Sequence, residues 1–429
     1  MIAMAPGLYS QGNWQVIGEM PYPIFGGQAI VLDSLILIVG GTRTPPDQLV
    51  PLRATERIQA YDPKRHTWRE MTPMNVPRYG FAADTSSKNG LLLCGGSWQD
   101  DQQTFTIEKW NYQGFGLGTT ETVLQNAACN RVYFTGHTYR NRFYLFGGMS
   151  SPTSSVSGRF PEMIVFDMGT NSIIFNSDSV TRKHLLPYHH TSVRINNMVY
   201  IMGGVHAGIT TSILSYDLDK LDTSELIFSK VGDLTTVRAG CHAVVTDDHI
   251  CVIGGYTELA GPLSSVDLIS RSTFVTLPGP EMHHPRREPM TVIYEDTIYV
   301  FGGWNETDSV VAVIERIAKD DLVPVSIVQP GIAEGSPDDF ELGQNFPNPF
   351  NGTTIIPFRL SAAGKVRIEI FNILGERIAI LYNGPLSAGT HKLSWNATDE
   401  QQLPVPSGTY FYQLTTHDQK RSGKMILMR

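Results

Sequence analysis

One short apolar element occurs six times along the chain. Each copy is a run of four or five apolar residues, typical of a buried β-strand, that ends in two consecutive glycines. The pairs are Gly40-Gly41, Gly95-Gly96, Gly147-Gly148, Gly203-Gly204, Gly254-Gly255 and Gly302-Gly303. Another apolar segment and a tight turn precede each run, as in residues 290–294, Glu295-Asp296 and residues 298–301. The pattern predicts a succession of β-hairpins.

The spacing of these pairs predicts the architecture. Successive pairs are 55, 52, 56, 51 and 48 residues apart. A period near 50 residues is typical of a β-propeller with one four-stranded blade per repeat. In the first repeat, residues 58–63 form the expected third strand and residues 67–71 the fourth. We therefore predict an all-β fold with six blades.

The first repeat also resembles a known family. Its Tyr61-Asp62, Trp68, Met74 and the following Arg78 closely resemble the kelch repeat, and the resemblance extends over about residues 13–317. It implies a kelch-type propeller, as in the central domain of galactose oxidase, spanning residues 13–328.

The two ends of the repeat region suggest how the ring closes. Trp14 precedes Met20 by six residues, as Trp68 precedes Met74, so the chain begins with a fourth strand that has no blade of its own. The sixth repeat has only one good strand after its double glycine. We expect residues 13–17 to complete the sixth blade, which would remove exposed sheet edges.

The last hundred residues have a different pattern. Residues 329–339 are polar and rich in Gly and Pro, which indicates a linker. Beyond it, Val366, Ile368 and Ile370 alternate with polar residues, as in a half-buried strand. About 90 residues of this kind fit one small Ig-like β-sandwich, over residues 340–429.

This C-terminal segment closely resembles the type A C-terminal sorting domain of the type IX secretion system. The residues that carry the resemblance are Asn345, Pro347, Asn348, Pro349, Phe350, Asn351, Gly408, Tyr410, Lys424, Met425 and Leu427. Gly352 stands where the family usually has Pro. The resemblance implies export through the periplasm, recognition of residues 340–429 by the translocon, and release or attachment at the bacterial cell surface. A plain Ig-like or fibronectin-like accessory domain is the alternative.

The N-terminus and the composition bear on the same question. Residues 1–12 resemble the end of a signal peptide without its basic and apolar parts. The chain has 33 basic and 41 acidic residues, a net charge of −8, so no positive field favours nucleic acid. No apolar run reaches the roughly 18 residues of a transmembrane helix. We expect an exported, monomeric protein without a transmembrane segment.

Four cysteines are too few for a disulfide scaffold. Cys241 and Cys251 flank a turn at Asp247-Asp248. If Val244 pairs with Cys251, the two cysteines point to opposite faces of the hairpin. We expect all four thiols to be free and buried.

Arginines recur 16 or 17 residues before four of the double glycines. They are Arg78, Arg131, Arg238 and Arg286, with Arg287 beside the last. They are candidates for a basic collar at the channel mouth that binds an anionic ligand. In the kelch pattern this arginine also holds blades together, so a structural role is the alternative.

Aromatic and histidine side chains complete the candidate site. Loops after the double glycines contribute Trp98 and Trp304, and His190 precedes an inner strand. Histidines near the channel raise the question of a transition metal, but adjacent strand residues point to opposite faces, so each His-His pair can offer one ligand at most. We assign no metal, no cofactor and no catalytic residue.

These observations favour a propeller that acts as a non-catalytic binding module for a glycan or a protein. The chain lacks the usual catalytic motifs of hydrolases, metalloproteases and nucleotide-binding enzymes. The alternative is a carbohydrate-active enzyme, similar to sialic-acid mutarotases, that uses arginine and histidine at the channel mouth.

Overall fold

The computed structural model divides the chain into two units, residues 1–325 and residues 326–429. In unit 1 it describes residues 14–43, 53–87, 90–99, 102–114, 117–149, 163–177, 186–206, 208–221, 226–258, 260–305 and 309–324. In unit 2 it describes residues 340–343, 345, 348, 350, 352–360, 362–373, 375–387, 389–401, 403–416 and 420–427.

Several predicted features lie outside this set. They are residues 1–12, the linker at 329–339, Pro347, Pro349 and Asn351, and the side chain of Trp98. Among the described residues, no helix has the length and apolar character needed to cross a bilayer.

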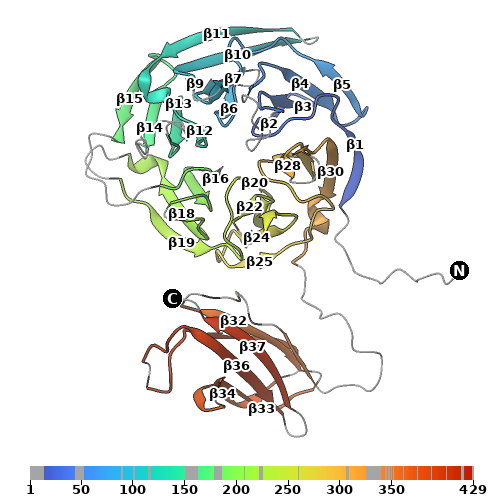
Figure 1. The fold of residues 1–429 in the computed structure, drawn as a ribbon, viewed down its shortest axis with the longest axis vertical. Coiled ribbons are helices and arrows are strands. Elements are labelled where there is room, and N and C mark those ends of the chain that lie inside the picture. The colour runs from blue at the N-terminus through green and yellow to red at the C-terminus, as the bar shows by residue number, and fades with distance from the viewer. Residues whose placement is uncertain are drawn as a thin grey trace, which may run out of the picture. The chain divides into compact units, whose positions relative to one another are not determined.

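The described part of unit 1 contains six four-stranded antiparallel sheets around a central axis (Figure 1). In each sheet, the strands are given in order from the innermost to the outermost. Sheet 1 contains β2 (Gln28–Leu32), β3 (Leu35–Val39), β4 (Ile58–Asp62) and β5 (Thr67–Glu70), and sheet 2 contains β6 (Ala82–Ser87), β7 (Gly90–Cys94), β10 (Thr106–Gly114) and β11 (Leu117–Gln125). Sheet 3 contains β12 (Thr135–Tyr139), β13 (Arg142–Phe146), β14 (Met163–Asp167) and β15 (Ser172–Asn176).

The remaining three sheets follow the same order. They are sheet 4 with β16 (Thr191–Ile195), β17 (Met198–Met202), β18 (Ser212–Asp217) and β19 (Ser229–Asp233), sheet 5 with β20 (His242–Val245), β21 (His249–Ile253), β24 (Val266–Ser270) and β25 (Thr276–Pro278), and sheet 6 with β26 (Met290–Tyr294), β27 (Thr297–Phe301), β30 (Val313–Ala318) and β1 (Gln15–Glu19).

Short two-stranded ribbons and 3-10 turns accompany these sheets. Three two-stranded ribbons follow double glycines, namely β8 (Ser97–Gln99) with β9 (Gln102–Gln103), β22 (Tyr256–Thr257) with β23 (Gly261–Pro262), and β28 (Trp304–Asn305) with β29 (Ser309–Val310). Single 3-10 turns are η1 (Ala127–Cys129), η3 (Leu218–Lys220) and η4 (Lys319–Asp321).

The N-terminal strand occupies the outer position of the last sheet. β1 pairs antiparallel with β30, with Gln15 opposite Arg316 and Glu19 opposite Val313. The amide of Gly303 also donates to the carbonyl of Ile24, at 3.1 Å, so sheet 6 is joined to the segment that enters sheet 1. Both contacts close the ring between the two ends of unit 1.

The double glycines connect each sheet to the next. Gly254 has φ +63°, and a Cβ there would lie 2.7 Å from the carbonyl oxygen of Arg286 in the next repeat. The amide of Gly255 donates to that same oxygen, at 3.0 Å. Only glycine combines this left-handed backbone with so close an approach. The repeated pair is therefore the signature of sheet-to-sheet packing.

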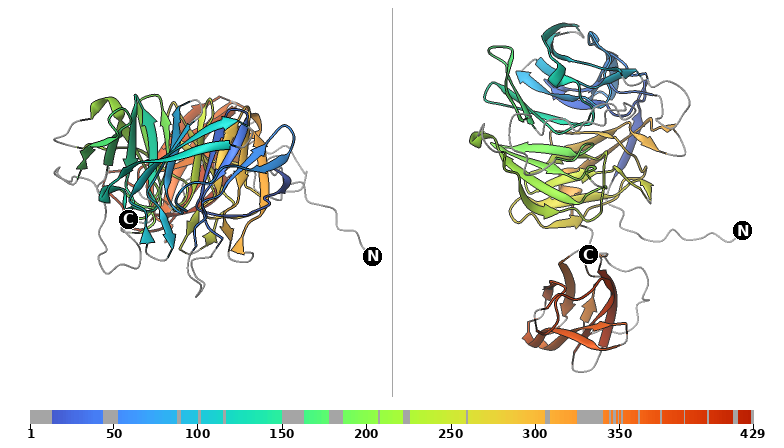
Figure 2. Two further views of the ribbon diagram at one scale, coloured as in Figure 1. Left: turned by 90° about the horizontal axis from the view of Figure 1, so that it is seen from above. Right: turned by 60° about the vertical axis from the view of Figure 1, so that its left-hand side comes forward.

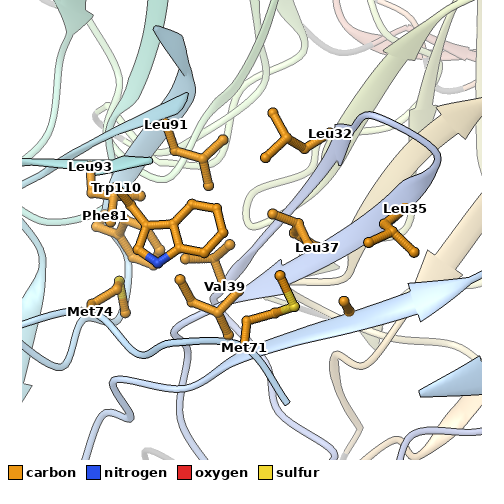
Figure 3. Close-up of a cluster of buried hydrophobic side chains, with 12 residues drawn as sticks. Leu32, Leu35, Leu37, Val39, Met71, Met74, Phe81, Leu91, Leu93 and Trp110 are labelled. Carbon is orange, nitrogen blue, oxygen red and sulfur yellow. The ribbon is translucent and has the colours of Figure 1, made fainter. Parts of the chain in front are cut away.

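Apolar side chains fill the spaces between neighbouring sheets. Each pair of neighbours encloses one cluster of buried residues. Between sheets 1 and 2, Trp110 is fully buried beside Phe81 and Leu93, with Val39 and Met71 opposite (Figure 3). Its indole donates to the carbonyl of Thr72, at 2.9 Å, so burial leaves no unpaired N–H. Burying each such large side chain contributes about 2–3 kcal/mol.

Unit 2 is a small sandwich of two antiparallel sheets (Figure 2). One sheet has the order β31 (Phe340–Leu342), β32 (Thr354–Leu360), β35 (Gly389–Trp395), and the other has the order β34 (Arg377–Leu386), β33 (Gly364–Asn372), β36 (Gly408–Thr415), β37 (Lys420–Leu427). Val366, Ile368 and Ile370 are buried on β33, as their alternation predicted.

The four cysteines are free and buried. Val244 lies opposite Cys251 in the β20–β21 hairpin, which is the predicted register. Cys241 and Cys251 accordingly belong to different apolar clusters, on opposite faces of the hairpin.

Candidate binding site at the channel mouth

The four repeated arginines do not form a collar around the channel. Arg78, Arg131, Arg238 and Arg286 are each fully buried. Each guanidinium donates to the carbonyl of the first glycine in its own sheet's double glycine, for example from Arg131 to Gly147 at 2.8 Å and from Arg286 to Gly302 at 2.8 Å. These four residues are therefore not ligand contacts at the channel mouth, because every one of them is directed into the protein.

Three of these arginines are paired with carboxylates on the third strand of the same sheet. The nitrogen-to-oxygen distances are 2.9 Å for Arg78 and Glu108, 3.3 Å for Arg238 and Asp267, and 2.6 Å for Arg286 and Glu315. All three acids are buried. Glu315 also accepts from the backbone amide of His283, at 2.8 Å, and thereby fixes the chain that enters sheet 6.

The sequence interpretation missed these acids. Each directly follows a buried aliphatic residue in the third strand of its sheet, as in Ile107-Glu108, Val266-Asp267 and Ile314-Glu315. A lone acid at that position is the signal that would have identified them.

The channel mouth is formed by six equivalent positions just before the inner strands. They are Gly26, Gly80, Tyr133, His189, Gly240 and Glu288, and each has a positive φ between +50° and +63°. Three are glycine, as this conformation favours. The other three place a tyrosine, a histidine and a glutamate in a conformation that L-residues rarely adopt, so at these positions the backbone holds large side chains over the channel.

These side chains cross the channel and touch one another. The Tyr79 hydroxyl donates to Oε1 of Glu288, at 3.1 Å, and lies 3.0 Å from the Tyr133 hydroxyl. Nε2 of His189 is 3.2 Å from Oε1 of Glu288. The rings of Tyr133 and His189 are 4.2 Å apart between centroids. We call Tyr79, Tyr133, His189 and Glu288 the plug, because they come from four different repeats and bridge the channel.

The glycines make room for the plug. A Cβ on Gly26 would lie 2.6 Å from Oε2 of Glu288, and one on Gly240 would lie 3.0 Å from Nε2 of His189. Burial alone would raise the pKa of the Glu288 carboxyl, but His189, Arg287 and the Tyr79 hydroxyl outweigh burial and lower it. Glu288 is therefore ionised at neutral pH.

Next to the plug, an arginine is stacked between two aromatic rings. The guanidinium carbon of Arg287 lies 4.0 Å from the centroid of Trp304 and 5.6 Å from that of Tyr256. Within the described part of the chain, this guanidinium has no hydrogen-bond or ion-pair partner, and Arg287 is partly exposed. We call Tyr256, Arg287 and Trp304 the rim. Trp304, a predicted site residue, thus lies at the mouth, but as a buried support for Arg287.

Below the plug, a cavity of about 440 Å³ runs along the inner strands. His137 and His242 line it, and burial lowers the pKa of each to about 4. Both imidazoles are therefore neutral at pH 7. Nδ1 of His242 lies 2.6 Å from the hydroxyl of Thr291.

His190, a predicted ligand contact, is held in a hydrogen-bond chain. Its Nδ1 lies 2.7 Å from the carbonyl of Pro187, so Nδ1 is the donor. Burial lowers its pKa to about 4, so Nε2 carries no proton and accepts from Thr135, at 3.0 Å. Thr135 accepts in turn from Ser192, at 2.6 Å, and Oγ of Ser192 lies 2.7 Å from Nε2 of His137. Ser192 thus donates to Thr135 and lies within hydrogen-bond distance of His137.

The three neutral histidines predict a pH-dependent stability. Their pKa is about 4 in the folded state, and about 6.5 when unfolded. Between these values the unfolded chain binds more protons, so the free energy of unfolding should fall as pH drops from 6.5 to 4, by about 1.4 kcal/mol per pH unit for each histidine. Guanidinium denaturation at a series of pH values measures this slope.

The control for this prediction is His242→Gln, which removes one of the three buried imidazoles. The variant should show a shallower pH dependence than the wild type, by about 1.4 kcal/mol per pH unit. An unchanged slope would mean that His242 does not stay neutral in the folded state.

The described side chains include no group of three or more His, Cys, Asp or Glu placed to hold a metal ion. The histidines are dispersed instead. His283 bonds to the carbonyl of Trp14, at 2.9 Å, and His284 lies 3.1 Å from Oε1 of Glu315.

Comparison with known proteins agrees with this architecture. A family model described as the KLHDC2/KLHL20/DRC7 Kelch-repeats domain matches residues 26–255, and one for the FlgD Ig-like domain matches residues 344–420. The chain is 21% identical to Kelch-like protein 15 of Homo sapiens over 265 residues, which are 56% of this chain and 40% of that protein. It is 22% identical to human Kelch-like protein 38 over 253 residues, 58% of this chain and 39% of that protein.

A shorter match is Protein C13 of swinepox virus, 33% identical over 63 residues, 15% of this chain and 13% of that protein. The chain spans about 40% of the length of the two Kelch-like proteins. The predicted all-β fold, with kelch repeats and a C-terminal Ig-like domain, is confirmed. Since the kelch model matches more than half of its residues, this chain belongs to the kelch-repeat family.

Proposed function

We propose that the propeller is a non-catalytic binding module that holds a glycan or protein partner at the channel mouth, and that the Ig-like unit directs export of the chain. The partner carries an acidic group, and Arg287 is its anchor. The observation that carries this proposal is the guanidinium of Arg287, which lies over the rings of Trp304 and Tyr256 and has no hydrogen-bond or ion-pair partner among the described residues.

The side chain of Arg287 is preorganised for binding. An arginine normally loses side-chain freedom when it binds a ligand, at a cost of about 0.5–1.5 kcal/mol. Stacking on two rings has already fixed Arg287, and its planar fork suits bidentate pairing with a carboxylate or phosphate. The plug supports the same binding mode, because Tyr79, Tyr133, His189 and Glu288 bridge the channel beside the rim and leave the ligand on the outer surface.

The proposal is tested by screening the full chain against arrays of glycans and peptides. We expect the bound probes to be enriched in carboxylate-bearing sugars or in peptides with acidic residues. We also expect their binding to become weaker as the salt concentration is raised. Binding only to neutral or basic probes would contradict a role for Arg287 as the anchor.

The arrangement of the arginines gives no support to the enzyme alternative. That alternative would gain support if Arg78, Arg131, Arg238 and a histidine converged on one concave pocket. Arg78, Arg131, Arg238 and Arg286 are instead distributed around the ring and bonded to carbonyl groups, and His190 is held by Thr135 and Pro187. We therefore retain the binding function alone.

The export proposal rests on the resemblance of residues 340–429 to type IX sorting domains, and the contacts of the resembling residues support it. The side chain of Asn348 accepts from the amide of Ile426, at 2.7 Å, and donates to the carbonyl of Lys424, at 3.1 Å. The amide of Phe350 donates to Ile426, at 2.9 Å. These bonds tie the start of the unit to its last strand, β37, so that the C-terminal segment belongs to a folded module.

Side-chain exposure along β37 also fits recognition by a translocon. Lys424 is exposed, whereas Met425 and Leu427 are buried in the core of the unit with Tyr410. The buried residues hold the fold, and the exposed lysine lies on the surface of the unit. The proposed destination is the bacterial cell surface or the medium, by way of the periplasm.

Deleting residues 340–429 should abolish secretion while leaving the propeller folded, since the two units have separate cores. In a host with a type IX system and a functional N-terminal signal, we expect the truncated propeller to accumulate in the periplasm. Fractionation followed by immunoblotting measures this. Unchanged secretion of the truncated protein would contradict the sorting role of unit 2.

A further inference from the structure

Two of the four buried cysteines lie side by side. Cys94 is the last residue of β7, and Cys129 is the last residue of η1, which leads into sheet 3. Both are fully buried in the apolar cluster between sheets 2 and 3. Their backbones are also close, because a Cβ on Gly95 would lie 2.7 Å from the carbonyl oxygen of Cys129.

The two thiols influence each other. The neighbouring thiol of Cys94 lowers the pKa of Cys129, and the guanidinium groups of Arg131 and Arg78 lower it further. Burial raises the pKa of Cys94. The two thiols are therefore unequal, since Cys129 loses its proton more readily and is the better nucleophile of the pair.

Cys241 and Cys251 differ from this pair. They point to opposite faces of one hairpin and belong to different clusters. Burial raises the pKa of each thiol to about 12. Neither has a thiol neighbour in its cluster.

We propose that Cys94 and Cys129 form a disulfide when the chain folds in an oxidising compartment. This inference rests on the proposed export only for the place where the oxidant is met. The bond would join the inner half of sheet 2 to the segment that enters sheet 3 and would close a loop of about 35 residues. It would thus stabilise the contact between sheets 2 and 3.

The reaction is a thiol–disulfide exchange with a small-molecule or protein disulfide as oxidant. The Cys129 thiolate attacks one sulfur of the oxidant, breaks its S–S bond and releases one thiolate. Cys94 then loses its proton and attacks the Cys129 sulfur, which releases the second thiolate. Two protein thiols are oxidised, one oxidant disulfide is reduced to two thiols, and the two protons go to those thiols.

The burial of both sulfurs sets the timing of this exchange. Cys94 and Cys129 are each 0% exposed in the folded protein. An oxidant disulfide therefore reaches them only before the interface between sheets 2 and 3 closes. We expect the bond to form during folding and only slowly in the folded, reduced protein.

The test uses the full chain, unfolded in guanidinium with a reductant and refolded in a buffer of reduced and oxidised glutathione. Free thiols are then alkylated in denaturant and the peptides mapped by mass spectrometry. We expect a Cys94–Cys129 linkage, with Cys241 and Cys251 alkylated. Four alkylated cysteines, or a linkage that includes Cys241 or Cys251, would overturn the proposal.

Variants and melting temperatures provide a second readout. Dithiothreitol should lower the Tm of the refolded wild type by about 5 °C. Cys129→Ala should show no such shift, whereas the matched control Cys251→Ala should show the full shift. A wild-type Tm that does not change with reduction would also contradict the proposal.

The outcome is independent of export. If the chain stays inside the cell but forms the Cys94–Cys129 bond on refolding, the export proposal fails and the pairing stands. If the exported chain retains four thiols, the pairing fails and export stands.

Discussion

Arg286→Ala is expected to destabilise the propeller by about 3–5 kcal/mol. The substitution leaves the carboxylate of Glu315 buried without the guanidinium that lies 2.6 Å from it. It also removes the donor to the carbonyl of Gly302, at the junction that closes the ring. The loss is a large part of the total stability of an ordinary domain. Denaturation in guanidinium, followed by tryptophan fluorescence, measures it.

A double substitution separates the two possible roles of this arginine. Arg286→Met combined with Glu315→Leu replaces the buried pair with apolar side chains of similar size and should recover most of the lost stability. If Arg286→Ala is as stable as the wild type, the guanidinium does not hold sheet 6 together, and its assignment as a structural residue is wrong.

Sequence reasoning could predict the fold because the repeats impose a backbone requirement. Gly254 and its five counterparts have positive φ, and any Cβ there would meet the next repeat. No other residue satisfies both conditions, so the glycine pair persists in all six repeats where Trp68 and Tyr61 have few counterparts. Closure by the N-terminal strand was predictable for a related reason, since a four-stranded sheet with one strand missing needs a partner.

The candidate site was harder to predict because sequence does not reveal where a side chain points. Arg286 and Arg287 are neighbours, yet Arg286 is bonded to Gly302 and Glu315 inside the sheet, whereas Arg287 is stacked on Trp304 at the mouth. The spacing of the repeat identifies Arg286 as the recurring arginine. Arg287 is placed at the rim by the backbone β-bridge between Arg287 and Trp304, which the spacing does not reveal.

Three of the four plug residues could have been found by comparing the repeats with one another. Tyr133, His189 and Glu288 stand where three other repeats have glycine with the same positive φ. A large side chain at a position whose backbone favours glycine carries a strain of about 1–3 kcal/mol, which is a recognised mark of functional sites. The unusual residue in a repeat was therefore more informative than the repeated one.

Arg287→Ala is expected to weaken binding of an acidic ligand by about 10- to 100-fold, because a hydrogen bond to a charged group contributes about 1.5–3 kcal/mol. The fold should survive, since within the described residues the guanidinium contacts ring faces and has no hydrogen-bond partner. Arg287→Lys should recover only part of the affinity, because lysine keeps the charge but lacks the planar fork. The Tm of each variant checks the fold.

The most direct test of the binding site compares Arg287 with a matched arginine. Arg57 also stacks on an aromatic ring, that of Tyr22. Its guanidinium, however, already forms an ion pair with Glu70, at 2.9 Å. The affinities of the wild type, Arg287→Ala and Arg57→Ala are measured by titration with the tightest acidic probe from the array. We predict a loss of 10-fold or more for Arg287→Ala alone. Equal affinity of all three proteins would contradict binding at the channel mouth.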